Sequence, residues 1–207
     1  MAERTVEDRL REEYFELFPE VRRVAEQLEA EIRYRLLPIS RGLDRYERLY
    51  VKSRVKECES AIESLRLRQE GSTFDREKPD FYTLYNLRDL AGVRVLAFPR
   101  NRLAEIDSHL QTFFSSWTPD PVRGESGEPL AFKYHGFCQA TEKIMGEYQI
   151  VSMLTGLFWE VEHSAIYKPI PRLKGMAESI KMRERTADVL EALRAFEEEF
   201  ESLIQGE

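Results

Sequence analysis

The 207-residue chain carries a formal net charge of −7, with 33% charged and 42% hydrophobic residues. The apolar fraction is enough for a sizeable core, so composition argues against intrinsic disorder and for one compact domain with a little extra at each end. The acidic balance argues against simple coating of nucleic acid or of an anionic membrane.

The two cysteines, Cys58 and Cys138, form no disulfide framework and have no zinc-ligand spacing. The N-terminus lacks an apolar signal core, and no run of residues is long and apolar enough to span a bilayer. We therefore expect a soluble cytoplasmic protein that does not act at a membrane.

The first third of the chain has mostly helical periodicity. Apolar residues at steps of three and four predict a helix over residues 5–37, which Pro19 is expected to break or kink and Pro38 to end. Residues 45–68 are predicted to be mostly helical, and the polar segment 69–82 is interpreted as a loop.

The pattern changes at residues 93–98, where a short run rich in β-branched residues predicts a strand. The elements predicted after it are a helix from about Arg102 to Phe114 capped by Asn101, a loop over 118–129, strands over 132–141 and 148–151, a helix over 152–167, and a long amphipathic helix over 176–204. The acidic run 197–199 is interpreted as a solvated helix face. This order predicts an α/β or α+β core with helical flanks.

Two carboxylates stand out by position, although each local pattern also suits an ordinary structural role. Asp89 precedes the predicted strand at 93–98, next to the small pair Ala91 and Gly92, which would let a ligand or another backbone approach closely. Glu147 shares one strand face with Gln149, because side chains alternate along a strand. Together they are candidate ligands of a metal and a substrate.

A basic cluster is the second candidate feature, and its members are Lys52, Arg54, Lys56, Arg66 and Arg68. In the predicted helix, the first and third of these lie four residues apart and share a face that could hold phosphates. Interleaved glutamates make ordinary ion pairing along a helix the competing interpretation.

Other kinds of site have weaker support. Glu162 and His163 could contribute near the end of a predicted helix, where a lone histidine is more often structural. The sequence contains no Gly-rich phosphate loop and no nucleophile elbow. The three histidines have no zinc-like spacing.

Taken together, residues 52–168 resemble the synthetase domain of the RelA/SpoT family in its small stand-alone form. Four blocks occur in the family's order. They match its Arg-x-Lys, Asp-Ile-Ala-Gly-Ile-Arg-Ile, Glu-Ile-Gln-Ile and closing Glu-His-Ser to Tyr-Lys motifs, and they lie at residues 53–56, 89–95, 147–150 and 162–168. Each block is weak alone, and their common order is the signal.

The resemblance implies a mixed β-sheet flanked by helices, related to nucleotidyltransferases. It divides the chain into an N-terminal helical extension, a synthetase domain and a C-terminal amphipathic helix, at residues 1–44, 45–170 and 171–207. It also implies transfer of pyrophosphate from ATP to the 3′-hydroxyl of GDP or GTP, which makes the alarmones ppGpp and pppGpp of the stringent response. The family's hydrolase domain has no room here.

The resemblance also assigns roles to single residues. Asp89 and Glu147 would hold Mg²⁺, and Glu147 would alternatively act as general base toward the 3′-hydroxyl. Arg54 and Arg94 would grip the ATP, with Arg94 stacking on adenine, while Lys56 would neutralise phosphates. Tyr134 would stack on the acceptor base. Further candidates are Lys133, His135 and Gln149 for the acceptor, and Glu162 and His163 in supporting positions.

The departures from the family pattern fall on the acceptor side. The family's Gly-Tyr-Arg-Ser-x-His stretch is matched to residues 133–138, which keep Tyr134 but not the arginine or the final histidine. An asparagine that helps to read guanine falls near Gly156.

Three hypotheses therefore stay open. The first is a synthetase that acts on GDP or GTP. The second is a toxin-like relative that modifies another acceptor, such as the 3′ end of tRNA, and has an antitoxin partner. The third is a degenerate domain that binds a nucleotide or a protein without turnover. By the same resemblance, we expect a homo-oligomer.

Overall fold

A computed structural model describes residues 4–124, 127, 129–138, 143–162 and 180–206. Its centre is a six-stranded mixed sheet with the strand order β1-β2-β6-β5-β3, and β4 also pairs with β5. The strands are β1 (Arg48–Val55), β2 (Ala91–Phe98), β3 (Thr118–Pro119), β4 (Val122–Arg123), β5 (Pro129–Phe137) and β6 (Met145–Ser152). Only the β2–β6 pair is parallel among the described pairings. The predicted mixed sheet with flanking helices is confirmed.

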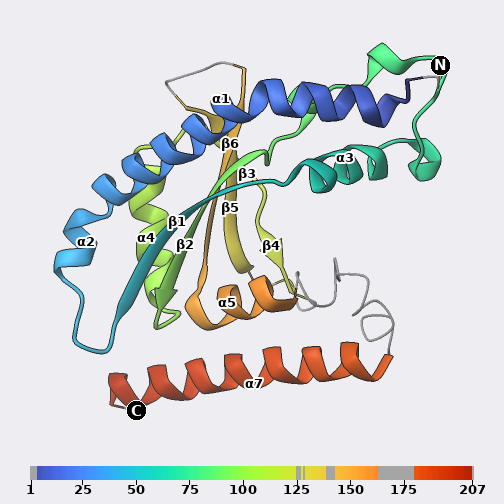
Figure 1. Ribbon diagram of the computed structural model, residues 1–207. Coiled ribbons are helices and arrows are strands. Elements are labelled where there is room, and N and C mark those ends of the chain that lie inside the picture. The colour runs from blue at the N-terminus through green and yellow to red at the C-terminus, as the bar shows by residue number, and fades with distance from the viewer. Residues whose placement is uncertain (1–3, 125–126, 128, 139–142, 163–179, 207) are drawn as a thin grey trace.

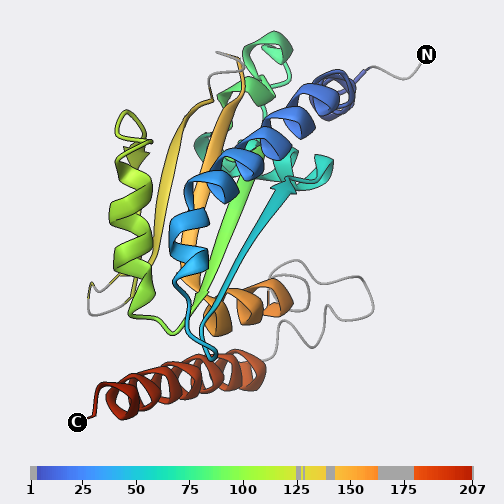
Figure 2. The same cartoon turned by 90° about the vertical axis from the view of Figure 1, so that its left-hand side faces the viewer.

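Helices cover the two faces of the sheet unequally (Figures 1 and 2). The long helix α1 (Val6–Arg35) and helix α4 (Arg102–Gln111) pack on one face, where their apolar side chains form the main core with β1, β2 and β6. Helix α5 (Met153–Glu162) lies against one end of the other face, and α7 (Ile180–Gln205) lies beneath α5. The described helices therefore leave most of the second face, called the open face, uncovered.

Helix α1 forms as predicted, but it is not broken at Pro19, which lies inside it. Pro19 is exposed, and the buried stripe of α1 continues on both sides of it, so tertiary packing outweighs the missing hydrogen bond. Pro38 does not end this helix either. It lies in the first turn of the short helix α2 (Leu37–Arg41), where a backbone N–H is not needed.

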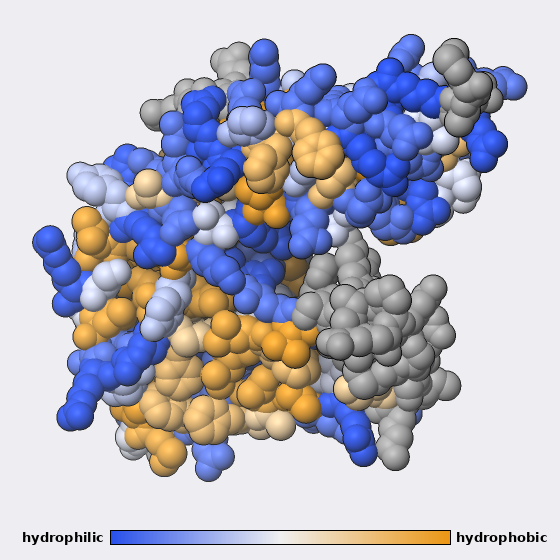
Figure 3. Space-filling view, in the orientation of Figure 1, coloured by the Kyte–Doolittle hydropathy of each residue, from blue (hydrophilic) through white to orange (hydrophobic). Residues whose placement is uncertain are grey.

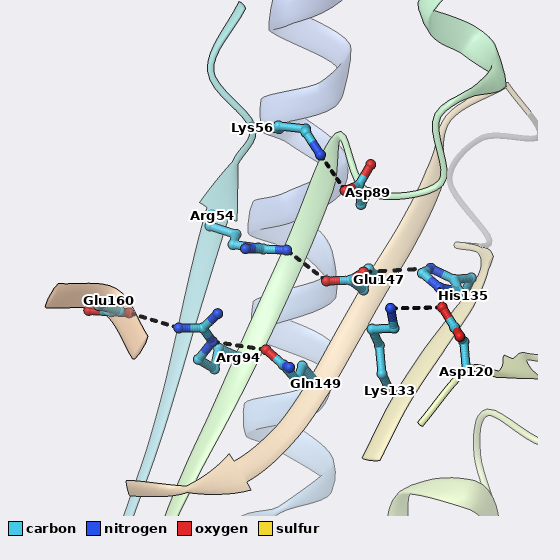
Figure 4. A network of polar contacts seen from close by, with 10 residues as sticks. All are labelled: Arg54, Lys56, Asp89, Arg94, Asp120, Lys133, His135, Glu147, Gln149 and Glu160. Carbon is cyan, nitrogen blue, oxygen red and sulfur yellow. Dashed lines mark hydrogen bonds and ion pairs between the residues drawn. The ribbon is translucent and has the colours of Figure 1, made fainter. Parts of the chain in front are cut away.

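The predicted helix over residues 45–68 is wrong for its first half, which is strand β1; only α3 (Cys58–Leu67) is helical. Leu49, Val51 and Val55 recur at even spacings and pack into the core on the side of α1. Arg54 points to the open face in Figure 4, and Lys52 on the same side of the strand pairs with Glu160 of α5. The spacing of two is a strand period that was interpreted as helical. Lys52 and Lys56 consequently do not share a helix face.

The remaining predictions hold in outline. The loop over 69–82 contains the short 3₁₀ turns η1 (Glu70–Ser72) and η2 (Pro79–Phe81), and η3 (Leu84–Asn86) follows it. The loop over 118–129 includes strands β3 and β4. Asn101 precedes α4, but its side chain makes no capping hydrogen bond. No described helix combines the length and apolar character that a membrane crossing requires.

The interpretation of the acidic run in α7 is wrong for one residue. Glu198 and Glu199 are exposed, whereas Glu197 is fully buried against β6.

Figure 3 shows the open face of the molecule, with polar side chains in its middle and apolar ones gathered toward α5 and α7.

Candidate active site

The register of the sheet aligns two neighbouring rows of residues across the open face, and all but one of them carry polar side chains. Paired Cα positions run through β1, β2, β6 and β5 in order. One row is Lys52, Arg94, Gln149 and Lys133; the next is Arg54, Gly92, Glu147 and His135. Residues from four strands thus converge on one surface (Figure 4).

Arg54 reaches across β2 to contact Glu147 on the strand beyond. Its Nη2 donates a hydrogen bond of 2.8 Å to Oε1 of Glu147, whose side chain is only 6% exposed. Gly92 makes this path possible, because a Cβ there would lie 3.0 Å from Nε of Arg54 and 3.2 Å from its Cγ. The glycine noted in the sequence therefore makes room for an arginine.

Asp89 lies in the loop that enters β2, beside Lys56 at the end of β1. Backbone pairing between Lys56 N–H and the Leu90 carbonyl, at 2.9 Å, brings the two segments together, and Lys56 Nζ donates a hydrogen bond to Asp89 Oδ2. Burial opposes ionisation of Asp89, but Lys56, helped by Arg68 and Arg54, outweighs it and holds the pKa of Asp89 below its ordinary value.

The second oxygen of Asp89 fits a cation. Oδ1 is buried and has no hydrogen-bond partner, although a buried carboxylate oxygen normally has one. Asp89 and Glu147 line the same pocket. No cluster of three or more His, Cys, Asp or Glu side chains suited to a metal occurs in the described part of the chain. Two carboxylates suit Mg²⁺, which usually completes its shell with water and substrate phosphates.

Arg94 is held in place from three sides. Its Nε donates to Gln149 Oε1 at 3.1 Å, its Nη1 donates to the Gly156 carbonyl at 3.4 Å, and Glu160 of α5 lies 3.6 Å away. Burial, and then the nearby Arg54, lower the pKa of Arg94 from its ordinary value. Helix α5 therefore fixes the position of this guanidinium.

Asp120, between β3 and β4, ties two β5 side chains to the site. It accepts a hydrogen bond from Lys133 at 2.7 Å and lies 3.0 Å from His135 Nε2. Lys133, and then His135, hold the pKa of Asp120 below its ordinary value. The other ring nitrogen of His135 is 3.8 Å from Glu147 Oε2. Asp120 was missed because it lies in a stretch whose Gly and Pro content indicated only a loop.

Two pockets share this face and have Lys133 in common. The larger, of about 830 Å³, is lined by Arg54, Arg94, Val122, Lys133, Gln149, Trp159, Glu160 and Glu162. The smaller, of about 360 Å³, is lined by Arg68, Asn86, Arg88, Asp89, Asp120, Lys133, His135 and Glu147. Most of the predicted site residues, including Arg68 of the basic cluster, therefore lie together, and Asn86, Arg88 and Trp159 join them.

Tyr134 does not join them. It points to the opposite face of the sheet, where it is buried, stacks on Tyr148 and donates a 2.8 Å hydrogen bond to Asp107. Arg66 pairs with Glu63 along α3, which is the ordinary helix pairing considered above. Glu162 ends α5, and burial raises its pKa. His163 lies outside the described residues.

Comparison with solved structures identifies the fold. The chain matches small alarmone synthetase 1 from Bacillus subtilis with a TM-score of 0.64, at 20% identity over 91% of this chain and 94% of that one. The chain has the fold of a small alarmone synthetase.

Other structures agree with this assignment. A GTP pyrophosphokinase family protein from Streptococcus pneumoniae matches with a TM-score of 0.60, at 18% identity over 92% of each chain. The protein smu.1046c from Streptococcus mutans matches with a TM-score of 0.63, also at 18% identity, over 90% of this chain and 93% of that one. Neither a model of a protein family nor a curated protein matches the sequence. The small alarmone synthetase fold is thus clear in three dimensions, where sequence identity is low.

Proposed function

We propose that this protein transfers pyrophosphate from ATP to the 3′-hydroxyl of GDP or GTP and so makes ppGpp or pppGpp. One observation carries the proposal: three basic side chains and two carboxylates matching the family motifs converge on one open face of the sheet, namely Arg54, Lys56, Arg94, Asp89 and Glu147. Small alarmone synthetase 1 from Bacillus subtilis, which shares the fold, has been solved with AMPCPP and with its product pppGpp.

The larger pocket is the proposed ATP site. Arg54 and Arg94 present planar guanidinium groups there, which suit stacking on adenine and contact with phosphates. Lys56 lies at the end of the same strand as Arg54 and supplies a further positive charge for the phosphates. Pyrophosphate transfer depends mainly on such positioning and charge neutralisation, so these residues match what the chemistry needs.

Asp89 and Glu147 are the proposed Mg²⁺ ligands, and bound Mg²⁺ would neutralise charge on the triphosphate. Glu147 lines the smaller pocket, with Arg54 of the larger pocket on one of its oxygens and His135 near the other. In this position it accepts the proton of the attacking 3′-hydroxyl, which makes that oxygen a better nucleophile. Arg54 and His135 keep the carboxylate turned toward the acceptor.

The smaller pocket is the proposed acceptor site, with Lys133, His135 and Gln149 as contacts at its border with the larger one. The family's Gly-Tyr-Arg-Ser-x-His stretch can instead be matched three residues earlier, to residues 130–135. This match pairs His135 with the family's final histidine. Ala131 then takes the place of the family's tyrosine. This agrees with the structure, in which Tyr134 is buried on the face of the sheet that lies away from the proposed site. In this match the acceptor base has no tyrosine of β5 on which to stack.

A second acceptor class is supported by one feature of the smaller pocket. Among the described residues that line it, none is Phe, Tyr or Trp, so these residues offer a guanine base no large ring on which to stack. Another 3′-hydroxyl acceptor, such as the 3′ end of tRNA, is therefore the alternative, as is nucleotide binding without turnover.

Incubation with γ-labelled and β-labelled ATP and with GDP, GTP, adenine nucleotides or tRNA separates these functions. We expect a labelled 3′-pyrophosphorylated guanine nucleotide, and none with Asp89→Ala or Glu147→Ala. Label on tRNA alone would favour the second acceptor class. Binding of ATP without product on any acceptor would refute pyrophosphate transfer and leave a binding domain.

A further inference from the structure

Helix α7 is seated across α5 at one end of the sheet (Figures 1 and 2). Phe200 packs on Tyr46 and Phe98, with ring centroids 5.7 and 4.9 Å away. Glu201 accepts a hydrogen bond from the backbone N–H of Asn101. These contacts, all in the second half of α7, join it to the ends of β1 and β2.

The deepest contact of α7 is made by a carboxyl group. Glu197 is 0% exposed, and one of its oxygens accepts a hydrogen bond from the hydroxyl of Ser152. Its other oxygen, Oε2, is buried without a hydrogen-bond partner. Burying an ionised carboxylate with so little compensation is costly, so this seat favours the neutral form.

Ser152 connects this seat to the proposed active site. It is the last residue of β6, the strand that carries Glu147 and Gln149, and α5 begins at the next residue. The backbone N–H of Thr155 lies 3.5 Å from the same hydroxyl. One serine therefore contacts the first turn of α5 and Glu197 of α7.

Helix α5 in turn positions Arg94. A Cβ at Gly156 would come within 2.4 Å of Leu96 and 2.9 Å of Val151, so α5 approaches the sheet more closely than a larger residue allows. Because α5 lies this close to the sheet, the Gly156 carbonyl and the Glu160 carboxylate can contact Arg94. A shift of α5 would change the guanidinium that lines the larger pocket.

We infer that Glu197 is a positioning residue: by seating α7 on Ser152 it holds α5, and through α5 it sets Arg94 for ATP. The inference rests on the proposed ATP site and adds to it a control by the C-terminal helix. ATP affinity would then depend on the contact between Glu197 and Ser152, which lies outside both pockets.

The charges around Glu197 determine how the seat responds to pH. Burial raises the pKa of Glu197, Arg100 opposes that rise, and Glu201 and Glu198 add to it. Because the seated form binds the proton more tightly than an unseated one, seating is strongest in acid. It weakens as pH rises from the ordinary carboxyl range through the raised pKa.

The test uses the full chain with Glu197→Gln, which stays neutral, and with Glu199→Gln as the matched exposed control on the same helix. Hydrogen exchange of α5 and α7, and calorimetric titration with AMPCPP, are measured from pH 5 to 8.5. For the unaltered protein and for Glu199→Gln, we expect faster exchange in both helices and about a three- to tenfold weaker Kd toward high pH. Glu197→Gln removes most of this pH dependence.

Ser152→Ala provides a second route, because it removes the donor without adding charge. It is expected to speed exchange in α7 and α5 and to weaken AMPCPP binding at every pH. The inference is overturned if Glu197→Gln keeps the pH dependence, or if α7 loosens while α5 and the Kd stay unchanged. If the unaltered protein binds no AMPCPP, the proposed ATP site fails, and exchange in α5 still decides whether Glu197 positions that helix.

Discussion

The pair of Lys56 and Asp89 allows a quantitative test of the candidate site. Replacing Lys56 with Met keeps the length of the side chain but removes the ammonium group that contacts Asp89 Oδ2. The other oxygen of Asp89 already lacks a hydrogen bond. The variant therefore removes the Lys56 contact from a carboxylate that has no other described hydrogen bond to compensate for burial. The site would then contain a largely buried and uncompensated carboxylate.

The expected loss follows from burial. The two side chains are 18% and 20% exposed. Removing one partner of a fully buried pair costs about 3–5 kcal/mol, and exposed pairs contribute about 0.2–1 kcal/mol. For this mostly buried pair we expect about 2–3 kcal/mol of unfolding free energy, which lowers Tm by about 4–12 °C in a chain of this size.

The pKa of Asp89 determines how the stability difference between the two proteins changes with pH. In the unaltered protein the pKa of Asp89 is held low by Lys56, so the pair's contribution is present at neutral pH and is lost as pH falls through that lowered value. In Lys56→Met the desolvation of Asp89 dominates and its pKa rises. The difference in Tm between the two proteins should therefore shrink as pH falls from 7 toward 5.

Thermal unfolding monitored by circular dichroism at several pH values measures this difference. The matched control is Lys78→Met, which breaks an exposed pair in which Lys78 and Asp75 lie 3.7 Å apart and are 71% and 44% exposed. We expect the control to change stability by less than about 1 kcal/mol at all pH values. Equal Tm values for the two variants at pH 7 would refute the reasoning.

Three further changes test the site. Glu147→Gln should lower kcat by about a hundredfold or more, because it removes the proposed proton acceptor; an active variant would exclude that role. Gly92→Ala should displace Arg54 and raise the Kd for ATP several-fold with little change in Tm, and an unchanged Kd would contradict the contact. Gly156→Ala should cost about 1–3 kcal/mol in denaturant unfolding because its methyl group collides with Leu96, and full stability would contradict that packing.

Parts of the fold follow directly from sequence periodicity. The apolar stripe of α1, the β-branched run of β2 and the alternation of β6 are strong local signals, and the structure follows them. The helix assigned to residues 45–56 failed because two-residue spacing over eight residues is a short signal, and the charged residues Lys52 and Arg54 between the apolar ones suit either structure.

Parts of the candidate site followed from motif order. The matches at residues 53–56, 89–95 and 147–150 pointed to Arg54, Lys56, Asp89 and Glu147, and the fold joins the first of these to the last and the second to the third. The match near Tyr134 failed in register, since a shift of an odd number of residues moves every side chain of a strand to the other face. Asp120 had no sequence signal, because its role depends on β3 and β4 pairing with β5.

By itself, the sequence pointed to the residues that we propose for the donor chemistry, because those side chains lie in short motifs whose order is visible along the chain. Only the tertiary structure decided which face each side chain occupies, since that depends on strand register and on pairing between distant segments. It also decided that Glu197 is buried, because an acidic run on a helix gives no indication of what will pack against it.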